Sequence, residues 1–586
     1  MPHRQHLFSL RAGYALREVL GEGYGRSELL RDLIAGATVG IIAIPLAMAL
    51  AIASGVAPQY GLYTAIIAGG FIALAGGSRY SISGPTAAFV VILHPLAAKY
   101  GLAGLLLASV MAGGILIAMA YARLGRFIEY IPESVTLGFT GGIAIVIAVL
   151  QVPDFVGLPV QDLPEHFVGK LVAIGSHIYQ LDLGSTAVAV FTLAVMIGWP
   201  RLKTRVPPHL PALVLASLLA VLLKGLDVEV STIGSRFHYF LADGTEAAGI
   251  PPYLPTLEWP WNRPGPNGQS LELSLGLVSD LLPAAFAIAM LGAIESLLCA
   301  VVLDGMSGKR HSSNSELLAQ GAANLITPFF GGITATAAIA RSATNYKAGA
   351  VSPVAGLVHS LVVLLGLLFF AGLLALVPMP AMAALLMVVA WNMSEAHKSE
   401  QLVRTSSRGV VLVWLTCLFL TVFFDMVVAI TVGILLASVL FMKDIAALTQ
   451  VVDITANRGF VRSPLPDNWK VFKVNGPLFF AAADRIFGEL SQHSQHLSGL
   501  ILHMRYSAYL DAGGLSAIDK VMAHCARQGI PLYFSSWQFQ PLRTLARASG
   551  DGPNPLKASF ATLDDALSHV AQGGASHEAA TSHRTG

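Results

Sequence analysis

Long apolar runs recur along this chain, and they restrict it to a fold that buries them in lipid. The runs 33–54, 101–121 and 281–303 reach the roughly 20 residues that an α-helix needs to cross a bilayer. The run 357–376 also reaches that length, and shorter runs at 137–150, 212–223 and 410–424 approach it. Charged residues make up only 12% of the chain and the mean hydropathy is +0.66, which is too apolar for a soluble enzyme of this size. The sequence therefore predicts a polytopic α-helical membrane protein.

Two of the apolar segments are interrupted by similar stretches rich in Gly, Pro and Thr. The first break is Ser83-Gly84-Pro85-Thr86-Ala87-Ala88, and the second is 331–341, which reads GGITATAAIAR. Backbone polar groups are not left unpaired in lipid, so a helix is broken at this depth only where the freed groups line a cavity or meet a ligand. Two such breaks in corresponding halves indicate the substrate site of a transporter.

The two breaks predict a site for an anion. If Pro85-Thr86 and the stretch 334–336 begin half-helices, both N-termini present free N–H groups and the positive end of a helix dipole. Proline fits such a first turn, where its missing N–H leaves no bond unmade, whereas in the alternative reading Gly-Pro merely ends a loop. Hydroxyl donors from both breaks would lie at the same level. The predicted substrate-binding residues are Pro85, Thr86, Ala87, Thr334, Ala335, Thr336, Ala340 and Arg341.

Arg341 is the single charged residue between positions 329 and 346. A cation at membrane depth is costly unless it faces water or a ligand, which favours a role in attracting an anion. An arginine near the end of a span can instead extend to the lipid headgroups.

Glu295 lies near the middle of the apolar run 281–303. Burial favours the neutral form of a carboxyl group, so Glu295 can take up a proton and release it when water returns, which would couple proton entry to substrate. The alternative is a structural carboxylate that is hydrogen-bonded to a neighbouring span. Gln59 and Tyr63 are predicted to line the entrance, whereas His94 and His359 fit packing positions better.

Several other functions are disfavoured. The spans show no nucleophile with a base and no cluster of His, Asp and Cys, so neither an intramembrane enzyme nor a metal site is expected, and no cofactor is implied. The three cysteines are scattered, and a net charge of +2 without basic blocks argues against nucleic acid. An uncoupled anion channel would use the same broken helices and is the stronger competitor.

Charge placement predicts the topology. With about fourteen crossings, most basic loops fall on the side that holds both termini, which the positive-inside rule makes cytoplasmic. We expect a cytoplasmic N-terminal segment at 1–30, without the apolar core of a signal peptide, and a transmembrane domain at 31–447. The long segment 227–269 is expected to form an ordered external loop.

The composition changes after residue 443. Strand patterns at 469–474, 499–504 and 531–534, with an amphipathic helix at 515–528, predict a cytoplasmic α/β domain at 460–571. The residues 572–586 have no apolar pattern and are expected to be a disordered tail.

Several stretches resemble the sulfate permease (SulP) family of anion transporters with a C-terminal STAS domain. Within that family the chain is most similar to bacterial transporters of C4-dicarboxylates, through 293–306 and 390–398. The family motifs lie at 31–36, 55–63, 76–79, 83–86, 340–345 and 476–481.

The resemblance implies two inverted repeats of seven spans, core and gate subdomains, and a homodimer in the inner membrane. It also implies proton symport of succinate, fumarate or aspartate. Sulfate or bicarbonate is the alternative substrate, and in sodium-coupled relatives the acid matching Glu295 belongs to a cation site. The family has a basic residue at the position of Arg341. Many members carry a first-span glutamate where this chain has Leu46, which leaves Glu295 as the main carboxylate candidate.

The resemblance also bears on regulation. STAS domains of one type are phosphorylated on a serine that precedes a helix, and the equivalent turn here, 511–514, reads DAGG. Because this turn has no hydroxyl group, phosphorylation there is not expected. Trafficking, gating or binding of a cytoplasmic protein remains the expected role of the domain.

Overall fold

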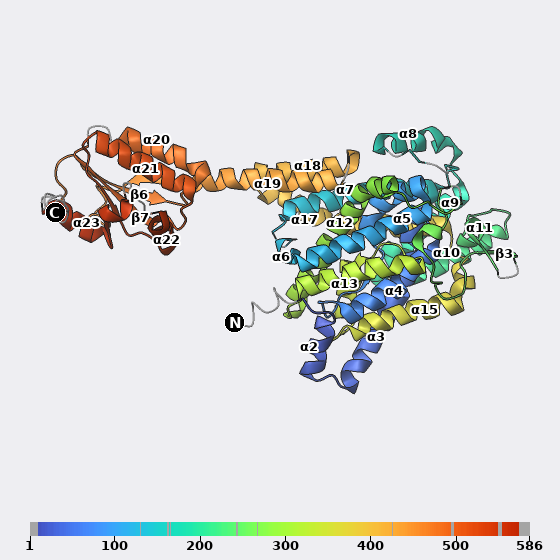
Figure 1. Cartoon of the computed structure of the whole chain (residues 1–586). Helices are drawn as coiled ribbons and strands as arrows, with labels where there is room; N and C mark the ends of the chain where they lie inside the picture. Colours follow the sequence, from blue (N-terminus) through green and yellow to red (C-terminus); the bar gives the residue numbers. More distant parts are fainter. Residues whose placement is uncertain are drawn as a thin grey trace. The chain divides into compact units, whose positions relative to one another are not determined.

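The computed structural model describes residues 10–572, except for 129, 161–162, 165, 205, 242–243, 267, 425, 494–496 and 549–553. The chain divides into two compact units, Met1–Ile434 and Leu435–Gly586, and the boundary falls within one helix, α19 (Met426–Leu448). Of the predicted disordered tail, all but Gln572 lies outside the described residues. The predicted architecture of a helical membrane protein with a C-terminal α/β domain is confirmed (Figure 1).

The first unit contains two successive sets of apolar helices (Figure 1). Among the described residues, eight helices are long and apolar enough to cross a membrane. The first set is α3 (Arg26–Ala53), α4 (Pro58–Ala75), α5 (Val90–Tyr121), α7 (Glu133–Val156), α9 (Leu183–Gly198) and α10 (His209–Lys224). The second is α12 (Leu275–Ser307), α13 (Ser313–Ile326), α14 (Ile339–Lys347), α15 (Val354–Leu374), α16 (Met379–Met393), α18 (Arg408–Phe423) and α19.

The two sets correspond helix for helix once α5 is divided. Gly101 has a left-handed backbone (φ 65°) that interrupts α5, so its two parts match α14 and α15. The packing is reciprocal: α3 lies against α15 as α12 lies against α5, and α4 lies against α15 as α13 lies against α5. The two-residue strands β1 (Ser83–Gly84) and β4 (Thr336–Ala337) pair antiparallel. Antiparallel pairing of equivalent segments is expected when two repeats are inverted relative to each other.

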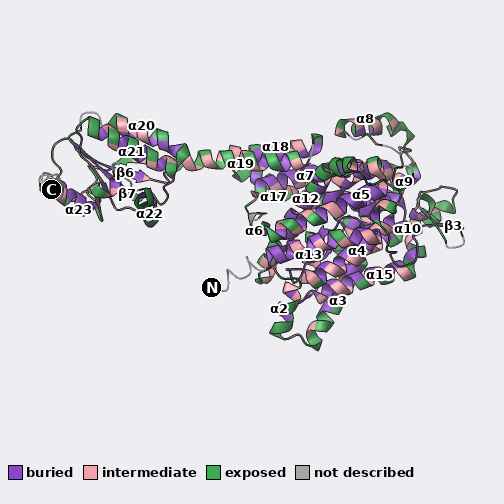
Figure 2. Ribbon diagram, in the orientation of Figure 1, coloured by how far each residue is buried: buried purple, intermediate pink, exposed green. Residues whose placement is uncertain are grey.

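Small residues let the helices approach closely. A Cβ on Gly61 of α4 would lie 2.0 Å from the Ala47 carbonyl oxygen of α3, and one on Gly36 would lie 2.3 Å from the Ala355 oxygen of α15. Because these neighbours are backbone atoms, neither position can hold a side chain larger than hydrogen. Small residues of this kind are typical of helix–helix interfaces in membranes. Figure 2 shows the buried residues in the interior of this unit and exposed residues on its outward faces. Large apolar side chains are among the exposed ones, and Phe369 of α15 is 75% exposed.

Shorter elements connect these helices. The segment expected to be an ordered loop contains a small antiparallel hairpin, and an amphipathic helix links α16 to α18. These elements are α6 (Gly125–Ile128), α8 (Phe167–His177), α11 (Ile233–Arg236), β2 (His238–Phe240), β3 (Glu246–Ala248) and α17 (Ala396–Thr405).

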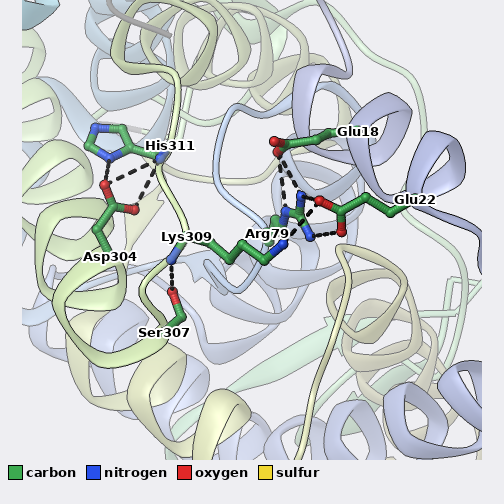
Figure 3. A network of polar contacts seen from close by, with 7 residues as sticks. All are labelled: Glu18, Glu22, Arg79, Asp304, Ser307, Lys309 and His311. Atoms are coloured by element: carbon green, nitrogen blue, oxygen red, sulfur yellow. Dashed lines mark hydrogen bonds and ion pairs between the residues drawn. The ribbon is translucent and has the colours of Figure 1, made fainter. Parts of the chain in front are cut away.

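A helix near the N-terminus, α2 (Tyr14–Glu22), is fastened to the turn that precedes β1. Arg79, whose side chain is only 6% exposed, pairs with Glu18 at 3.0 Å and donates to both oxygens of Glu22 at 2.6 and 2.7 Å (Figure 3). Lys309 donates to Glu22 at 3.0 Å. These ion pairs connect α2 to the loops before β1 and after α12.

The second unit holds a five-stranded sheet in the order β5-β6-β7-β8-β9, with β5 antiparallel and the others parallel. Alternate residues of the central strands face two separate cores, as period-two burial requires: Phe472 and Leu502 lie in one, Val471 and Ile501 in the other. The strands are β5 (Gln450–Asp453), β6 (Trp469–Asn475), β7 (Gly499–Tyr506), β8 (Leu532–Ser535) and β9 (Ser559–Phe560); the helices are α20 (Phe480–His493), α21 (Ala512–Arg527), α22 (Phe539–Ala548) and α23 (Leu563–Ala571).

The pattern-based elements of this unit agree with the structure to within a few residues. The helix expected at 515–528 is α21, which begins where Asp511 accepts a hydrogen bond from the Gly514 N–H at 2.8 Å. The strand β5 was not expected, and it places the start of the sheet before residue 460.

Candidate functional site

The two sequence breaks meet in the interior of the first unit. The strands β1 and β4 pair with Gly84 opposite Thr336, and all four of their residues are buried. The residues that follow β4 hold the other edge of the first break, because Ala338 N–H donates to the Ile82 oxygen and Ser342 Oγ accepts from the Ile82 N–H. The two breaks thus satisfy part of each other's freed backbone groups, as lipid burial requires.

A helix begins directly after each strand. Thr86 is the N-cap of a short 3₁₀ turn, η1 (Ala87–Phe89), that continues into α5, and Ala338 is the N-cap of α14. Neither N-cap side chain bonds the first turn. The prediction that the stretch 334–336 begins the second half-helix is wrong: α14 begins only at Ile339, Thr336 lies in β4, and the Ala335 N–H donates to a side chain of α13.

One threonine from each break, Thr86 and Thr336, bonds to neighbouring residues of α12. Thr86 donates from its hydroxyl to the half-buried Glu295 carboxylate at 2.9 Å. Thr336 shares a hydrogen bond of 2.6 Å with Ser296 and donates to the Gly292 oxygen. The predicted pair of hydroxyl donors is therefore unequal, because the Thr336 hydroxyl is fully buried and already bonded within the protein.

Arg341 reaches from α14 to the first break. The side chain is 5% exposed, and its Nη2 donates to the Pro85 oxygen. A Cβ on Gly84 would lie 2.9 Å from Nη1, which has no hydrogen-bond partner. The guanidinium is therefore buried against the strand that leads into η1, and it does not extend to the lipid headgroups.

The remaining residues of the second break differ in exposure. Thr334 is buried and its hydroxyl bonds to Ser109 at 2.7 Å. Ala335 is buried and its peptide pairs with the Asn324 amide. Ala340, in the first turn of α14, is exposed. The solvent-accessible part of the second break is therefore the first turn of α14, and it does not include Thr334 or Thr336.

The residues predicted at the entrance lie on α4. Gln59 is half-buried with an unpartnered Oε1, and Tyr63 is 6% exposed and packs edge-on against Tyr60. Among the described residues, no hydrogen bond or ring contact joins Gln59 or Tyr63 to the two breaks. Instead Thr64, which sequence reasoning missed, donates to the Ile333 oxygen at 3.2 Å.

Two histidines behave as packing residues. His94 bonds through Nδ1 to the Ala53 oxygen at 3.0 Å, and His359 is fully buried opposite Gly69. Within the described part of the chain, no group of three His, Cys, Asp or Glu residues could hold a metal ion.

A cavity of about 630 Å³ lies between α7, α16, α17 and α18 and contains none of the predicted site residues. Its lining is mostly apolar, and its cation, Arg404, is already paired with Glu400 at 2.5 Å. We therefore locate the candidate site at the crossing of β1 and β4.

Two broken segments that cross beside a buried arginine, within a bundle of membrane-spanning helices, define the architecture of an anion transporter. Residues 29–417 match the sulfate permease family, and residues 462–566 match the STAS domain. The chain therefore belongs to the sulfate permease family and carries a C-terminal STAS domain. It is a multi-pass membrane protein and an anion transporter, not an enzyme.

Named relatives support this assignment. The chain is 39% identical over 525 residues to "Putative sulfate transporter YvdB" of Bacillus subtilis, covering 89% of this chain and 94% of the relative. It is 29% identical to the bicarbonate transporter BicA of Picosynechococcus, covering 78% and 80%.

Solved structures share the fold. The transmembrane domain of a cyanobacterial bicarbonate transporter BicA has a TM-score of 0.59 at 28% identity, covering 69% of this chain and 98% of that one. The murine Solute Carrier 26 family member A9 anion transporter has a TM-score of 0.80 at 17% identity, covering 96% and 94%. The latter likeness concerns the fold alone.

Proposed function

We propose that the protein imports C4-dicarboxylates such as succinate, fumarate and aspartate together with protons. The observation that carries this proposal is the contact of Thr86 with Glu295, which places a carboxylate at the start of the broken helix. When ionised, this group repels an anionic substrate from the helix start; when protonated, it does not. Proton binding and substrate binding therefore favour each other, which is the requirement for symport.

The arrangement suits a substrate with two separated negative charges. The helix starts at η1 and α14 each provide N–H groups and a positive dipole end. Arg341 connects them, because it belongs to the first turn of α14 and bonds the residue just before Thr86. One carboxylate of a C4-dicarboxylate can occupy each helix start, with the unpartnered Nη1 of Arg341 available to either.

An inorganic anion is the second candidate, because the relatives described above are named for sulfate or bicarbonate. A compact anion would use one helix start together with Arg341. Glu295 with neighbouring hydroxyl groups is also a plausible ligand set for sodium. A channel would need no titrating acid.

Uptake into proteoliposomes separates these candidates. The purified chain is assayed with labelled succinate, aspartate, sulfate and bicarbonate under an inward pH gradient, and then with a sodium gradient and no pH difference. We expect accumulation of succinate driven by the pH gradient. Sulfate uptake without succinate uptake would reject the dicarboxylate proposal, uptake that follows the sodium gradient would reject proton coupling, and flux that never exceeds equilibrium would indicate a channel.

We further propose that the protein resides in a bacterial plasma membrane as a homodimer, with both termini cytoplasmic and the STAS domain available to a cytoplasmic protein. Single cysteines at the exposed residues Ser231 and Ser568, labelled from outside intact cells with an impermeant maleimide, test the orientation. We expect labelling at Ser231→Cys only, and the opposite pattern would invert the topology. The mass of the detergent-solubilised protein, measured by light scattering, tests the dimer.

A further inference from the structure

Beyond the polar first turn of α13, which reads Ser313-Asn314-Ser315, three further polar side chains form a row along one face of the helix. Glu316, Gln320 and Asn324 are spaced by four residues, so they lie one above the other. All three are at most 1% exposed. Buried polar groups at membrane depth are costly unless they have partners, so the contacts of this row indicate its purpose.

The side-chain amide of Asn324 bonds to the backbone of Ala335 as a neighbouring strand would. Its Nδ2 donates to the Ala335 oxygen at 2.9 Å, and its Oδ1 accepts from the Ala335 N–H at 2.7 Å. The same Nδ2 donates to the Gln320 oxygen at 2.9 Å. Both polar groups of the Ala335 peptide are thereby satisfied by one side chain, immediately before β4 begins.

Gln320 bonds to the first break, and Glu316 bonds to the turn that precedes it. Gln320 donates from Nε2 to the Ser83 hydroxyl at 3.1 Å and to the Glu316 carboxylate at 3.2 Å. Glu316 accepts from the N–H groups of Gly77 and Ser78 at 2.8 and 3.1 Å. A single rigid helix thus bonds both of the strands that cross at the candidate site.

We infer that α13 positions the anion site: Asn324 and Gln320 fix the register of the two break strands, and thereby the direction of the helix starts that follow them. The inference rests on the proposed function, because it assigns these helix starts to the anion. β1 and β4 are two residues long, and a ladder this short leaves their register weakly specified. Asn324 supplies the missing constraint on β4, and Gln320 supplies it on β1. Neither side chain needs to touch the substrate.

Asn314 provides a matched control on the same helix. It is a fully buried asparagine in the first turn of α13, and its Oδ1 accepts from the Gly125 N–H, in the α5–α7 connection rather than in either break. Asn314→Ala and Asn324→Ala therefore each remove a buried amide from α13, and only the second removes a contact with a break strand.

The test uses the full chain in lipid nanodiscs and in proteoliposomes. For Asn324→Ala we expect faster hydrogen–deuterium exchange in 331–347 and a rise of about tenfold in KM for labelled succinate or sulfate, with kcat changed less. Asn314→Ala should lower the melting temperature and leave KM and this exchange unchanged. Equal changes of KM in both variants, or no change of exchange and KM in Asn324→Ala, would overturn the inference.

A second variant covers failure to fold. Asn324→Leu keeps a similar side-chain volume but can neither accept from the Ala335 N–H nor donate to the Ala335 oxygen, so it should raise exchange in the same peptide. Unchanged exchange in this variant would count against the inference. If the wild-type chain transports neither succinate nor sulfate, the proposed function fails. The hydrogen–deuterium exchange data alone then decide whether α13 fixes the register of β1 and β4.

Discussion

Thr86 and Glu295 come from opposite halves of the chain, and the Thr86 hydroxyl donates a 2.9 Å hydrogen bond to the Glu295 carboxylate. The acid therefore lies at the N-cap of the first half-helix, although it belongs to α12 of the second set. Many relatives are expected to carry an acid in the first span, whereas in this chain the acid that contacts the helix start comes from α12. Leu46 then needs no titrating function.

Glu295→Gln should abolish uptake driven by a pH gradient while retaining exchange of labelled for unlabelled substrate. Glutamine keeps an acceptor for the Thr86 hydroxyl but has no ionisable proton. The coupling of proton uptake to transport is therefore lost, whereas substrate binding is retained. Counterflow and gradient-driven uptake in the same proteoliposomes distinguish the two effects. Asp280→Asn, an exposed acid on the same helix, is the control, and a Glu295→Gln protein with normal gradient-driven uptake would exclude Glu295 from coupling.

Arg341→Ala should weaken anion binding by about 2 kcal/mol or more, roughly a thirtyfold rise in Kd. The substitution removes a buried cation together with its bond to the Pro85 oxygen. Arg341→Lys should recover only part of the affinity. The planar guanidinium of arginine can donate to the Pro85 oxygen and to a ligand at the same time, whereas the ammonium group of lysine lacks this geometry. Anion-dependent shifts in melting temperature measure both. Lys347→Ala, at the exposed end of α14, should leave binding unchanged, and an equal loss there would reject a local role for Arg341.

Much of the architecture follows from the sequence. Apolar run lengths predict the spans, and strand alternation near Val471 and Ile501 predicts the α/β domain, because both depend on local periodicity. The breaks are also visible, since Gly84 and Pro85 interrupt an apolar run. These signals need no knowledge of the partner segment.

The contacts between the breaks could not be predicted. Strands of two residues have no periodicity, so nothing in the sequence indicates that Gly84 pairs with Thr336. For the same reason Thr336 was expected to face the ligand, although its hydroxyl bonds to Ser296. The amides of α13 were missed because a polar residue in an apolar helix does not reveal its partner. Their spacing at 316, 320 and 324 was the available signal.

Gly84→Ala should impair anion binding through Arg341 without unfolding the bundle. The added Cβ would lie 2.9 Å from Arg341 Nη1, too close for an unmoved guanidinium. The end of an arginine side chain can shift, so the expected cost falls on affinity, about tenfold, more than on stability. Gly114→Ala on α5, where no atom lies within 4 Å of the added Cβ, is the control. Equal anion-dependent melting shifts in both variants would contradict the placement of Arg341.

The contacts of α2 predict a loss of stability in acid. The hydrogen bond from Arg79, opposed by burial and supported by a weaker contribution from Lys309, lowers the pKa of Glu22 from 4.5 to about 2. Because the folded-state pKa is the lower one, this stabilisation is complete above about pH 4.5 and is lost as the pH falls toward 2. Glu22 is 46% exposed, so screening by water keeps the effect below about 1 kcal/mol.

Hydrogen–deuterium exchange of residues 14–22 between pH 5 and pH 3, corrected for the intrinsic rate, should therefore show α2 loosening in the wild type. Glu22→Gln should show faster exchange already at pH 5 and a weaker dependence on pH, since glutamine cannot form the charged pair with Arg79. Glu246→Gln, in the exposed hairpin strand β3, should retain the wild-type profile. The same pH profile in wild type and Glu22→Gln would show that the ion pair between Arg79 and Glu22 does not hold α2.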